Sequence, residues 1–298
     1  MSRSQYTFEN PVTRYPQVEA PEEQVPEPGH DTQLTPSADH GEETYRGSSR
    51  LVGRKALITG GDSGIGAAVA IAFAREGADV AFTYLPEEED DAQHVRNQVE
   101  TAGHKAVLIP GDLSHSSFCS QAVSTAVREL GGLDILVNNA GKQLYCTDIV
   151  DLPDEQFEQT MRTNVFALFH LTKAAVPHLR PGSTIINTTS VQAYLPSPIL
   201  LDYATTKAAI NGFTKALAAQ LAPKGIRVNA VAPGPIWTPL QPSGGQPNEK
   251  LAHFGSQTPL GRSGQPAELA PAYVFLASPE SSYVAGETLA VTGGMPTP

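Results

Sequence analysis

The stretch TGGDSGIG, Thr59 to Gly66, lies between the apolar run KALITG (55–60) and a segment of helical periodicity, GIGAAVAIAFAREG (64–77). A glycine-rich turn that ends a strand and opens a helix lets backbone amides approach a phosphate group, and the helix N-terminus adds partial positive charge. The glycines follow the pattern TGxxxGxG rather than GxGxxG. The stretch predicts a nucleotide-binding β–α unit, although the same turn also serves tight packing in many proteins.

The rest of the chain alternates short apolar runs with helical patterns. Most apolar runs are continuous, which is typical of strands covered on both faces. The predicted strands occupy residues 55–60, 78–85, 105–112, 133–141, 183–190, 226–234 and 287–294. The predicted helices occupy residues 64–77, 87–103, 116–131, 154–180, 203–225 and 266–281. This alternation predicts an α/β fold with a single Rossmann-type, doubly wound parallel sheet of seven strands, whose ligands bind beyond the carboxyl ends of the strands.

Residues 1–50 differ from the rest of the chain. They are rich in Pro and Glu, poor in aliphatic residues and without periodicity, so they cannot build a core alone. Apolar side chains are nevertheless spaced along them, at Tyr6, Phe8, Tyr15, Val18 and Tyr45. We divide the chain into a Pro/Glu-rich N-terminal extension (1–50) and a domain (51–298). The extension is either disordered or an arm laid over the domain or over a neighbouring subunit.

Composition narrows the classes of function. The 298 residues carry a net charge of -11, which argues against binding to nucleic acid or to anionic membranes. No segment supplies the ~18 uninterrupted apolar residues of a spanning helix, and the N-terminus has no apolar leader. Cys119 and Cys146 lack the spacing of a disulfide framework or a zinc site. We expect a cytoplasmic protein that acts on a small molecule and needs no metal.

Five motifs then occur in the order and spacing of one family. They are TGxxxGIG at Thr59–Gly66, NNAG at Asn138–Gly141, Ser190 after the fifth predicted strand, YxxxK at Tyr203 and Lys207, and PG at Pro233–Gly234. On these motifs the chain resembles the classical short-chain dehydrogenase/reductases over about residues 51–298. The extension and the run before the glycine-rich turn look like the bacterial glucose/ribitol dehydrogenase-like subgroup, many of whose members are known only as uncharacterised oxidoreductases. The resemblance implies NAD(P) as cofactor and hydride transfer between nicotinamide and a carbonyl or alcohol.

The resemblance also implies a set of cofactor-binding residues. The matching positions are Gly60, Ser63, Gly64, Ile65, Gly66, Tyr84, Asp112, Leu113, Asn139, Gly141, Tyr203, Lys207, Pro233, Gly234, Ile236 and Thr238. Within this set, Asp112 matches the residue that hydrogen-bonds the adenine amino group, and Leu113 lies beside the ring. Asn139 belongs to the element that stabilises the central sheet and borders the adenosine ribose. Ile236 and Thr238 match positions that meet the nicotinamide carboxamide.

The catalytic candidates are Ser190, Tyr203, Lys207 and Asn164. Tyr203 and Lys207 are four residues apart on a helical pattern, so both project from one face, and Ser190 ends the neighbouring strand. An adjacent ammonium and a nicotinamide cation should lower the pKa of the Tyr203 hydroxyl from its usual value near ~10. By resemblance, Ser190 polarises the substrate carbonyl, Tyr203 exchanges its proton, and Asn164 extends a water relay through Lys207.

The segment after the sixth predicted strand is long and rich in Pro and Gly, which is typical of a lid at an active-site edge. We expect its Trp237, Gln241 and Phe254 to line the substrate pocket together with Gln192 and Tyr194. The helix over 203–225 has an apolar face wider than one sheet needs to cover. In the family this helix pairs with its copy in another subunit, so the resemblance implies a homotetramer.

The choice between NAD and NADP depends on two positions. A basic residue in the glycine-rich turn grips a 2′-phosphate, whereas an acid after the second strand binds the free ribose diol. Here these positions hold Ser63 and Tyr84, so neither decisive residue is present and we expect weakly biased use of both dinucleotides. Asp62 is predicted to turn back and accept N–H groups of its own loop, as a helix cap does. The acidic run over 86–91 is predicted to be a solvated helix start.

Three functions fit these patterns to different degrees. The leading one is an NAD(P)-dependent oxidoreductase of an aldehyde, sugar or polyol. An epimerase or dehydratase of the extended branch also uses YxxxK, but those chains are usually longer and carry TGxxGxxG. A dinucleotide-binding sensor or scaffold protein with little turnover is the alternative from another class; such proteins commonly lose the Tyr or the Lys, and this chain keeps both.

Overall fold

Seven parallel strands form one sheet in the order β3-β2-β1-β4-β5-β6-β7, in a computed structural model that describes residues 4–20 and 23–297. The strands are β1 (Lys55–Thr59), β2 (Asp79–Tyr84), β3 (Ala106–Pro110), β4 (Ile135–Asn138), β5 (Thr184–Thr188), β6 (Arg227–Pro233) and β7 (Thr288–Val291). Each lies within the range predicted from its apolar run. The predicted doubly wound sheet is therefore confirmed, because buried parallel strands need continuous apolar runs on both faces.

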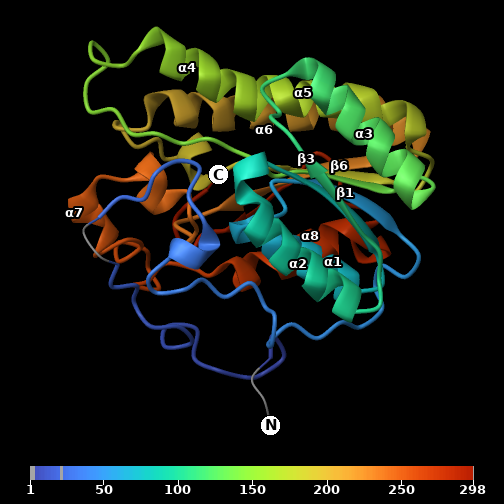
Figure 1. The fold of residues 1–298 in the computed structure, drawn as a ribbon, viewed down its shortest axis with the longest axis horizontal. Coiled ribbons are helices and arrows are strands. Elements are labelled where there is room, and N and C mark those ends of the chain that lie inside the picture. The colour runs from blue at the N-terminus through green and yellow to red at the C-terminus, as the bar shows by residue number, and fades with distance from the viewer. Residues whose placement is uncertain (1–3, 21–22, 298) are drawn as a thin grey trace.

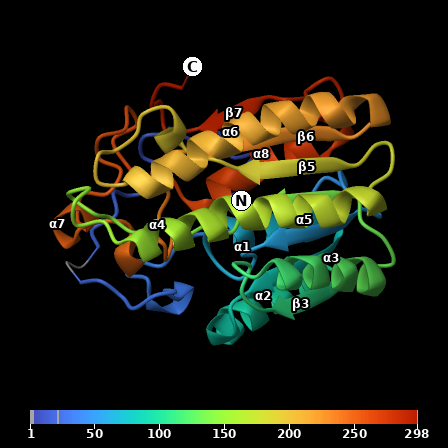
Figure 2. The same ribbon diagram turned by 90° about the horizontal axis from the view of Figure 1, so that it is seen from above.

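Helices cover both faces of the sheet (Figures 1 and 2). They are α1 (Gly64–Arg75), α2 (Glu89–Thr101), α3 (Ser116–Leu130), α4 (Asp154–Met161), α5 (Ala167–Ala175), α6 (Leu201–Leu221), α7 (Asn248–Leu251) and α8 (Pro266–Ala277). One apolar cluster packs α1, α2 and α8 against the sheet, and a second packs α3, α5 and α6 against the opposite face. Within the described part of the chain, no helix is long and apolar enough to span a membrane.

The order of the strands reverses beside β1. Leu57 of β1 pairs with Ala81 of β2 on one side and with Leu136 of β4 on the other. In such sheets the crossovers after the two central strands leave toward opposite faces, which opens a crevice at their carboxyl ends. The glycine-rich turn follows β1 and the NNAG motif follows β4, so the fold brings both motifs to this crevice.

The helix predicted over 154–180 is interrupted. A π-helical turn, η3 (Arg162–Phe166), separates α4 from α5, and the pattern ends in the 3-10 turn η4 (Val176–His178). A π-turn inserts a residue into the helical ladder and changes which side chains face inward, and such turns occur often at functional sites. Here the turn carries Asn164, which is buried.

The N-terminal extension packs on the domain of its own chain. Its described residues run over the surface from the lower edge of the molecule to the mouth of the crevice and back (Figure 1). Arg262 donates to the carbonyl of Pro11 from Nε (3.0 Å) and from one terminal nitrogen (2.8 Å). The indole Nε1 of Trp237 donates to the carbonyl of Pro36 at 2.7 Å. Main-chain carbonyls of the extension are thus held by buried side chains of the domain.

Candidate active site

A cavity of ≈ 800 Å³ lies at the carboxyl ends of the strands. Its walls come from the segments that follow β1 to β6, together with part of the N-terminal extension. This volume is within the range of pockets that enclose small ligands and cofactors. The cavity therefore lies where doubly wound sheets bind ligands, and it joins the glycine-rich turn to the catalytic candidates.

The glycine-rich turn has a backbone that only glycine adopts easily. Gly60 and Gly64 have φ values of 60° and 49°. A Cβ on Gly66 would lie 1.8 Å from the carbonyl oxygen of Gly60, so this glycine allows the close packing of α1 on β1 rather than lining the cavity. Ser63 and Ile65 line the cavity at the first turn of α1. This turn has the shape and the helix-end charge that a pyrophosphate requires.

The NNAG motif fastens the turn to the neighbouring strand. Asn139 Nδ2 donates to the carbonyls of Thr59 and Gly60, both at 3.1 Å, and the amides of Asn139 and Ala140 donate to the Thr59 hydroxyl. Asn138 Nδ2 donates to Asn187 Oδ1 at 2.9 Å across β4 and β5. The motif therefore ties together the centre of the sheet, as the resemblance implied, while Asn139 and Gly141 line the cavity.

The surroundings of Asp62 differ in part from the predicted helix cap. Its carboxylate does turn toward its own amide and Ser63, but Oδ2 is buried and lacks a hydrogen-bond partner in the described structure. Burial and the nearby carboxylates of Glu88 and Asp31 raise the pKa of Asp62 well above its usual value. The N–H of Gly64, the first residue of α1, donates instead to Asp31 Oδ2 at 3.1 Å. The predicted self-cap therefore holds at the Asp62 amide but does not extend to Gly64, where the N-terminal extension supplies the acceptor.

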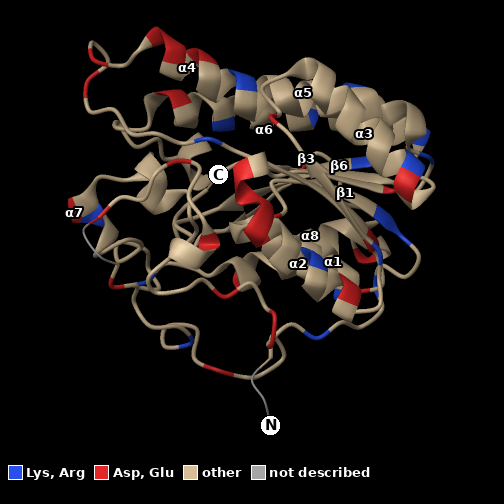
Figure 3. Ribbon diagram, viewed as in Figure 1, with Lys and Arg blue, Asp and Glu red and all other residues tan. Residues whose placement is uncertain are grey.

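The acidic run over 86–91 is also less solvated than predicted. Figure 3 shows these acids gathered at the start of α2. Glu88 and Asp91 are buried: Glu88 Oε2 accepts from the Leu85 amide at 2.8 Å, and Asp91 Oδ2 accepts from the Asp31 amide at 2.9 Å. Burial raises the pKa of Glu88 to about 7. The run therefore starts a helix and also binds the N-terminal extension at the edge of the cavity, through Asp91 and Asp31.

The adenosine end of the predicted site has its candidates in place. Tyr84, Asp112 and Leu113 line the cavity at the ends of β2 and β3. The Tyr84 hydroxyl donates to Glu89 Oε2 at 2.6 Å. Asp112 accepts from the Ser114 amide at 2.8 Å and from the Ser114 hydroxyl at 2.7 Å, which fixes its carboxylate in the turn after β3.

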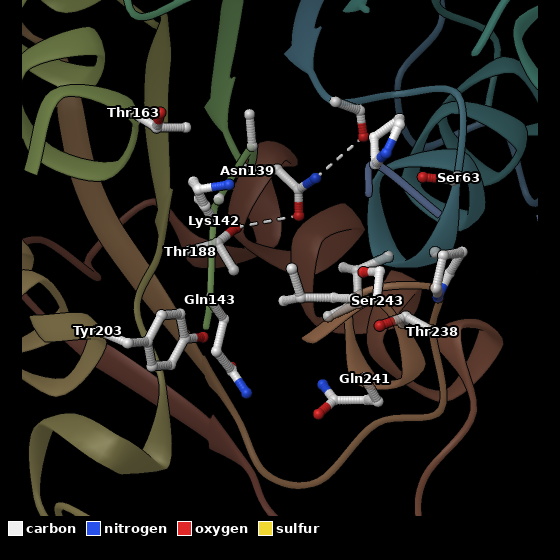
Figure 4. Close-up of a pocket in the computed structure, with 18 of the residues that line it drawn as sticks. Ser63, Asn139, Lys142, Gln143, Thr163, Thr188, Tyr203, Thr238, Gln241 and Ser243 are labelled. Atoms are coloured by element: carbon white, nitrogen blue, oxygen red, sulfur yellow. Dashed lines mark hydrogen bonds between the residues drawn. The ribbon is translucent and has the colours of Figure 1, made fainter. Parts of the chain in front are cut away.

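At the other end of the cavity, α6 places Tyr203 and Lys207 beside the end of β5. Both side chains are buried, and the Tyr203 hydroxyl points into the cavity (Figure 4). Lys207 Nζ donates to the carbonyl of Thr188 at 2.9 Å and lies 5.2 Å from the centre of the Tyr203 ring. Ser190, which follows β5, accepts from the Gln192 amide at 3.1 Å through its Oγ.

Burial controls the ionisation of the catalytic pair. It raises the pKa of Tyr203 to about 12, opposed by a hydrogen bond with Ser190. It also lowers the pKa of Lys207 to about 8. The expected lowering of the Tyr203 pKa by Lys207 is absent from the protein alone: burial of the phenolate raises this pKa, and the Lys207 ammonium is directed to the Thr188 carbonyl.

Asn164 lies behind this pair rather than on the main cavity. Its Oδ1 accepts from the Lys142 amide at 2.7 Å, and its Nδ2 donates to the Lys142 carbonyl at 2.9 Å and to the Thr206 hydroxyl at 3.0 Å. It lines a separate small cavity of ≈ 10 Å³ with Asn138 and Thr188. The π-turn η3 thus directs Asn164 between the NNAG segment and α6.

The segment after β6 lines the cavity with most of its predicted residues. These are Pro233, Gly234, Ile236, Thr238, Gln241 and Phe254, and Gln192 lines it from the segment after β5. Trp237 does not: it is 1% exposed and packs under the extension with Val18 and Leu34. Tyr194 is also outside the lining residues. The predictions for Trp237 and Tyr194 are wrong: Trp237 lies in an irregular loop and turns toward the extension, and Tyr194 ends a 3-10 turn over Val191–Ala193 whose Gln192 lines the cavity instead.

Several lining residues escaped prediction. Lys142 and Gln143 directly follow the NNAG motif, and this position in the sequence could have identified them as lining residues. Ser243 belongs to a second π-turn, η7 (Gln241–Gly245), in the segment after β6. Glu27 and Pro28 come from the N-terminal extension, whose Pro/Glu-rich sequence has no pattern that sets them apart from their neighbours.

Comparison with known proteins identifies the family. Residues 60–296 match the family model described as Enoyl-(Acyl carrier protein) reductase. The chain is 59% identical over 287 residues to the uncharacterized oxidoreductase YghA of Escherichia coli, which covers 96% of this chain and 98% of that protein. It is 46% identical over 279 residues to the glucose and ribitol dehydrogenase of Daucus carota, covering 92% of this chain and 96% of that protein.

A solved structure agrees with these relatives. The crystal structure of a short chain dehydrogenase from Burkholderia cenocepacia in complex with NADP has a TM-score of 0.76 and 36% identity, and the match covers 82% of this chain and 98% of that chain. Family model, relatives and structure all match over the domain that carries the five motifs. The chain therefore belongs to the short-chain dehydrogenase/reductases, NAD(P)-dependent oxidoreductases that act on CH–OH groups.

Proposed function

We propose that this chain interconverts a small hydroxylated aldehyde or sugar and its alcohol, with Ser190, Tyr203, Lys207 and Asn164 as the catalytic set. The observation that carries the proposal is the placement of Tyr203 and Lys207, buried side by side on α6, in one cavity with the glycine-rich turn. When bound, the nicotinamide supplies or accepts the hydride. The protein orients the substrate and moves the proton.

In this proposal the proton passes through Tyr203. Ser190 holds the substrate oxygen beside the Tyr203 hydroxyl, which donates its proton during reduction and recovers it during oxidation. Lys207 is held by the Thr188 carbonyl at 2.9 Å, and the cavity of ≈ 10 Å³ beside Asn164 has room for roughly one water molecule. A water at that place would lie between Asn164 and Thr188, the residue whose carbonyl holds Lys207.

The lining of the substrate end supports an uncharged, hydroxylated substrate. Gln143, Gln192 and Gln241 all line the cavity, and two of these neutral amides are labelled near Tyr203 in Figure 4. The Oε1 atom of Gln241 is buried without a hydrogen-bond partner in the described structure, so it is suited to a donor from the substrate. Lys142 is paired with Glu27, which weakens its attraction for an acidic substrate. The carrot relative is named for glucose and ribitol.

Replacing Gln241 by Leu should lower kcat/KM for a polyol such as ribitol by about tenfold, because the site loses one hydrogen bond to a substrate hydroxyl. Kinetics with an unsubstituted short aldehyde of similar length give the comparison, and there we expect little change. Gln121→Leu on the exposed side of α3 is the matched control. Equal losses on both substrates would show that Gln241 does not read hydroxyl groups.

We further propose that the site accepts both NAD and NADP. Tyr84 is tied to Glu89 and offers no carboxylate to the ribose diol, while Ser63 offers no positive charge to a 2′-phosphate. The Burkholderia structure binds NADP. Steady-state kinetics with both dinucleotides test this proposal. A preference far above tenfold for either one would contradict it.

The proposed assembly is a homotetramer in the cytoplasm. Phe166 and Phe169, beside α6 in the layer of α4 and α5, are 49% and 45% exposed, which leaves apolar surface for a second copy. The free thiols of Cys119 and Cys146 fit a reducing compartment. Light scattering of the purified protein measures the assembly.

A substrate screen tests the function as a whole. It follows NAD(P)H absorbance with both dinucleotides over aldehydes, sugars and polyols. Turnover of hydroxylated substrates is expected. Tight dinucleotide binding with no hydride transfer to any of them would contradict the enzymatic proposal and favour a dinucleotide sensor.

A further inference from the structure

One segment of the N-terminal extension crosses the mouth of the cavity. We call residues 23–33, which end in the 3-10 turn η1 (Asp31–Gln33), the strap. Figure 1 shows it in blue between the segment that carries α7 and the start of α2. The Val25 amide donates to the Pro242 carbonyl at 3.0 Å, and Gln24 Nε2 donates to the Gln246 carbonyl at 3.1 Å. The strap therefore begins on the segment that forms one wall of the cavity.

Apolar anchors hold the chain on both sides of the strap. Val18 and Ala20 precede it and Leu34 follows it, and all three are buried in one cluster with Trp237 and Leu251. Pro36, just beyond the strap, accepts from Trp237 Nε1 at 2.7 Å. The ends of the strap are thus fixed by buried contacts that do not involve the cavity.

The middle of the strap is part of the cavity wall at its catalytic end. Glu27 and Pro28 line the cavity, and the Glu27 carboxylate pairs with the ammonium of Lys142. The backbone of Lys142 is in turn held by Asn164. Gly29, with φ of 80°, keeps the strap close to the segment after β6: a Cβ on Gly29 would lie 3.0 Å from Cβ of Ser243.

The far end of the strap is fastened at the glycine-rich turn. Asp31 Oδ2 accepts from the Gly64 amide at 3.1 Å, and it forms an ion pair with His40 Nε2 at 3.0 Å. His40 offsets the negative charge of Asp31 beside the place where phosphates bind. Asp31 does not line the cavity, whereas Ser63, Gly64 and Ile65 do. The first turn of α1, where phosphates would lie, therefore stays inside the cavity beneath the strap.

These contacts differ in strength. The side chains of Glu27 and Lys142 are 46% and 23% exposed, and ion pairs of this exposure contribute little to stability. The anchors are apolar and buried. Opening of the middle of the strap, around Glu27, therefore costs much less than release of the extension or of Asp31 from His40, and local openings of this kind occur without global unfolding.

We propose that the strap retains the bound dinucleotide, and that Glu27 is a positioning residue that keeps the strap closed through Lys142. The strap spans the cavity from the catalytic end to the glycine-rich turn. A dinucleotide that reaches from one of these ends to the other lies beneath the strap and leaves when the strap opens. The inference rests on the proposed function, because it takes the cavity to be the dinucleotide site.

Dissociation kinetics test the strap in the full-length chain. NADPH bound to the protein is displaced by excess NADP, and the loss of its protein-enhanced fluorescence gives the dissociation rate constant. Glu27→Gln should raise this constant by about threefold to fivefold, and Glu27→Lys, which repels Lys142, by about tenfold. Glu27→Asp should restore part of the retention. Glu19→Gln removes the same charge from an exposed position of the extension outside the strap and is the control.

A merely structural role would change stability rather than retention. We therefore expect the melting temperature of Glu27→Lys without nucleotide to match that of the control, and NADPH to protect residues 23–33 from hydrogen exchange in the unsubstituted protein. Lys142→Met should add little to the dissociation rate of Glu27→Gln. If the dissociation rate constant of NADPH from Glu27→Lys lies within twofold of the control, the strap proposal is overturned while the proposed function stays intact. A native protein that binds neither dinucleotide would refute the proposed function, and the strap with it.

Discussion

Replacement of Tyr203 by Phe is expected to lower kcat for carbonyl reduction by about a thousandfold, the scale of a lost general acid. The substitution removes only the hydroxyl that points into the cavity in Figure 4. The ring remains packed beside Lys207, whose Nζ lies 5.2 Å from the ring centre and is held by the Thr188 carbonyl rather than by Tyr203. Dinucleotide affinity should therefore change little while the chemical step fails.

The control for this prediction is Tyr194→Phe. It removes the same hydroxyl from a residue on the segment after β5 that does not line the cavity, so we expect nearly full activity. Single-turnover reduction, followed by NAD(P)H absorbance, separates the chemical step from product release. Undiminished single-turnover activity of Tyr203→Phe would remove Tyr203 from the proposed proton path.

The dependence on pH follows from the same residue. Because burial raises the pKa of Tyr203 to about 12, the hydroxyl stays protonated through neutral pH in the protein alone. Carbonyl reduction, which uses the protonated form of Tyr203, should stay level with rising pH up to about 8, where Lys207 begins to lose its charge. Alcohol oxidation uses the phenolate and should rise over the same range. Paired pH profiles measure both directions, and a reduction rate that falls steeply between pH 6 and about 8 would contradict this assignment.

Sequence patterns were enough to predict the sheet and the placement of most of the site. A parallel sheet buried on both faces requires continuous apolar runs, and these runs are separated by helical patterns in an order that only a doubly wound topology accommodates. The carboxyl ends of the strands then meet at one edge. Residues that directly follow a strand, such as Asp112, Asn139 and Ser190, are therefore placed by the fold itself.

The remaining residues depend on irregular backbone. Trp237 lies in a loop without periodicity, where no rule fixes the direction of a side chain, and it is turned under the extension by one hydrogen bond to Pro36. The extension has no pattern of its own, because buried side chains such as Arg262 hold its backbone carbonyls. Asp62 illustrates the same limit: its loop was predictable, but the acceptor at Gly64 comes from Asp31, which is 33 residues away.

The second large effect concerns stability rather than catalysis. Glu76, directly after α1, is fully buried and receives donors from the end of the extension. Its carboxylate accepts from the Tyr45 hydroxyl at 2.7 Å, the Ser48 amide at 2.8 Å, and the Arg50 amide and Nε, both at 3.0 Å. These bonds and burial have opposite effects, and the bonds prevail, holding the pKa of Glu76 at about 2. One carboxylate thus satisfies several donors that have little access to water.

Glu76→Ala should destabilise the protein by about 3 kcal/mol, because it leaves the partly buried Arg50 guanidinium and two amides without their acceptor. For a domain of this size, that loss corresponds to a fall in melting temperature of roughly 6 °C or more. Glu100→Gln on α2 is the control: its carboxylate is 46% exposed in an ion pair with Arg96, and its removal should cost less than about 0.5 kcal/mol. Thermal unfolding of both variants at neutral pH makes the comparison.

Acid titration gives a second, independent measure of the same network. A carboxylate whose pKa is lower in the folded than in the unfolded protein stabilises fully above the unfolded pKa, which is near 4.5 for Glu, and loses that contribution as the pH falls toward about 2. The stability difference between the native protein and Glu76→Ala should therefore be constant above pH 5 and shrink below pH 4. A difference that persists unchanged at pH 3 would mean that the packing of the Glu76 side chain, and not its charge, holds the extension to α1.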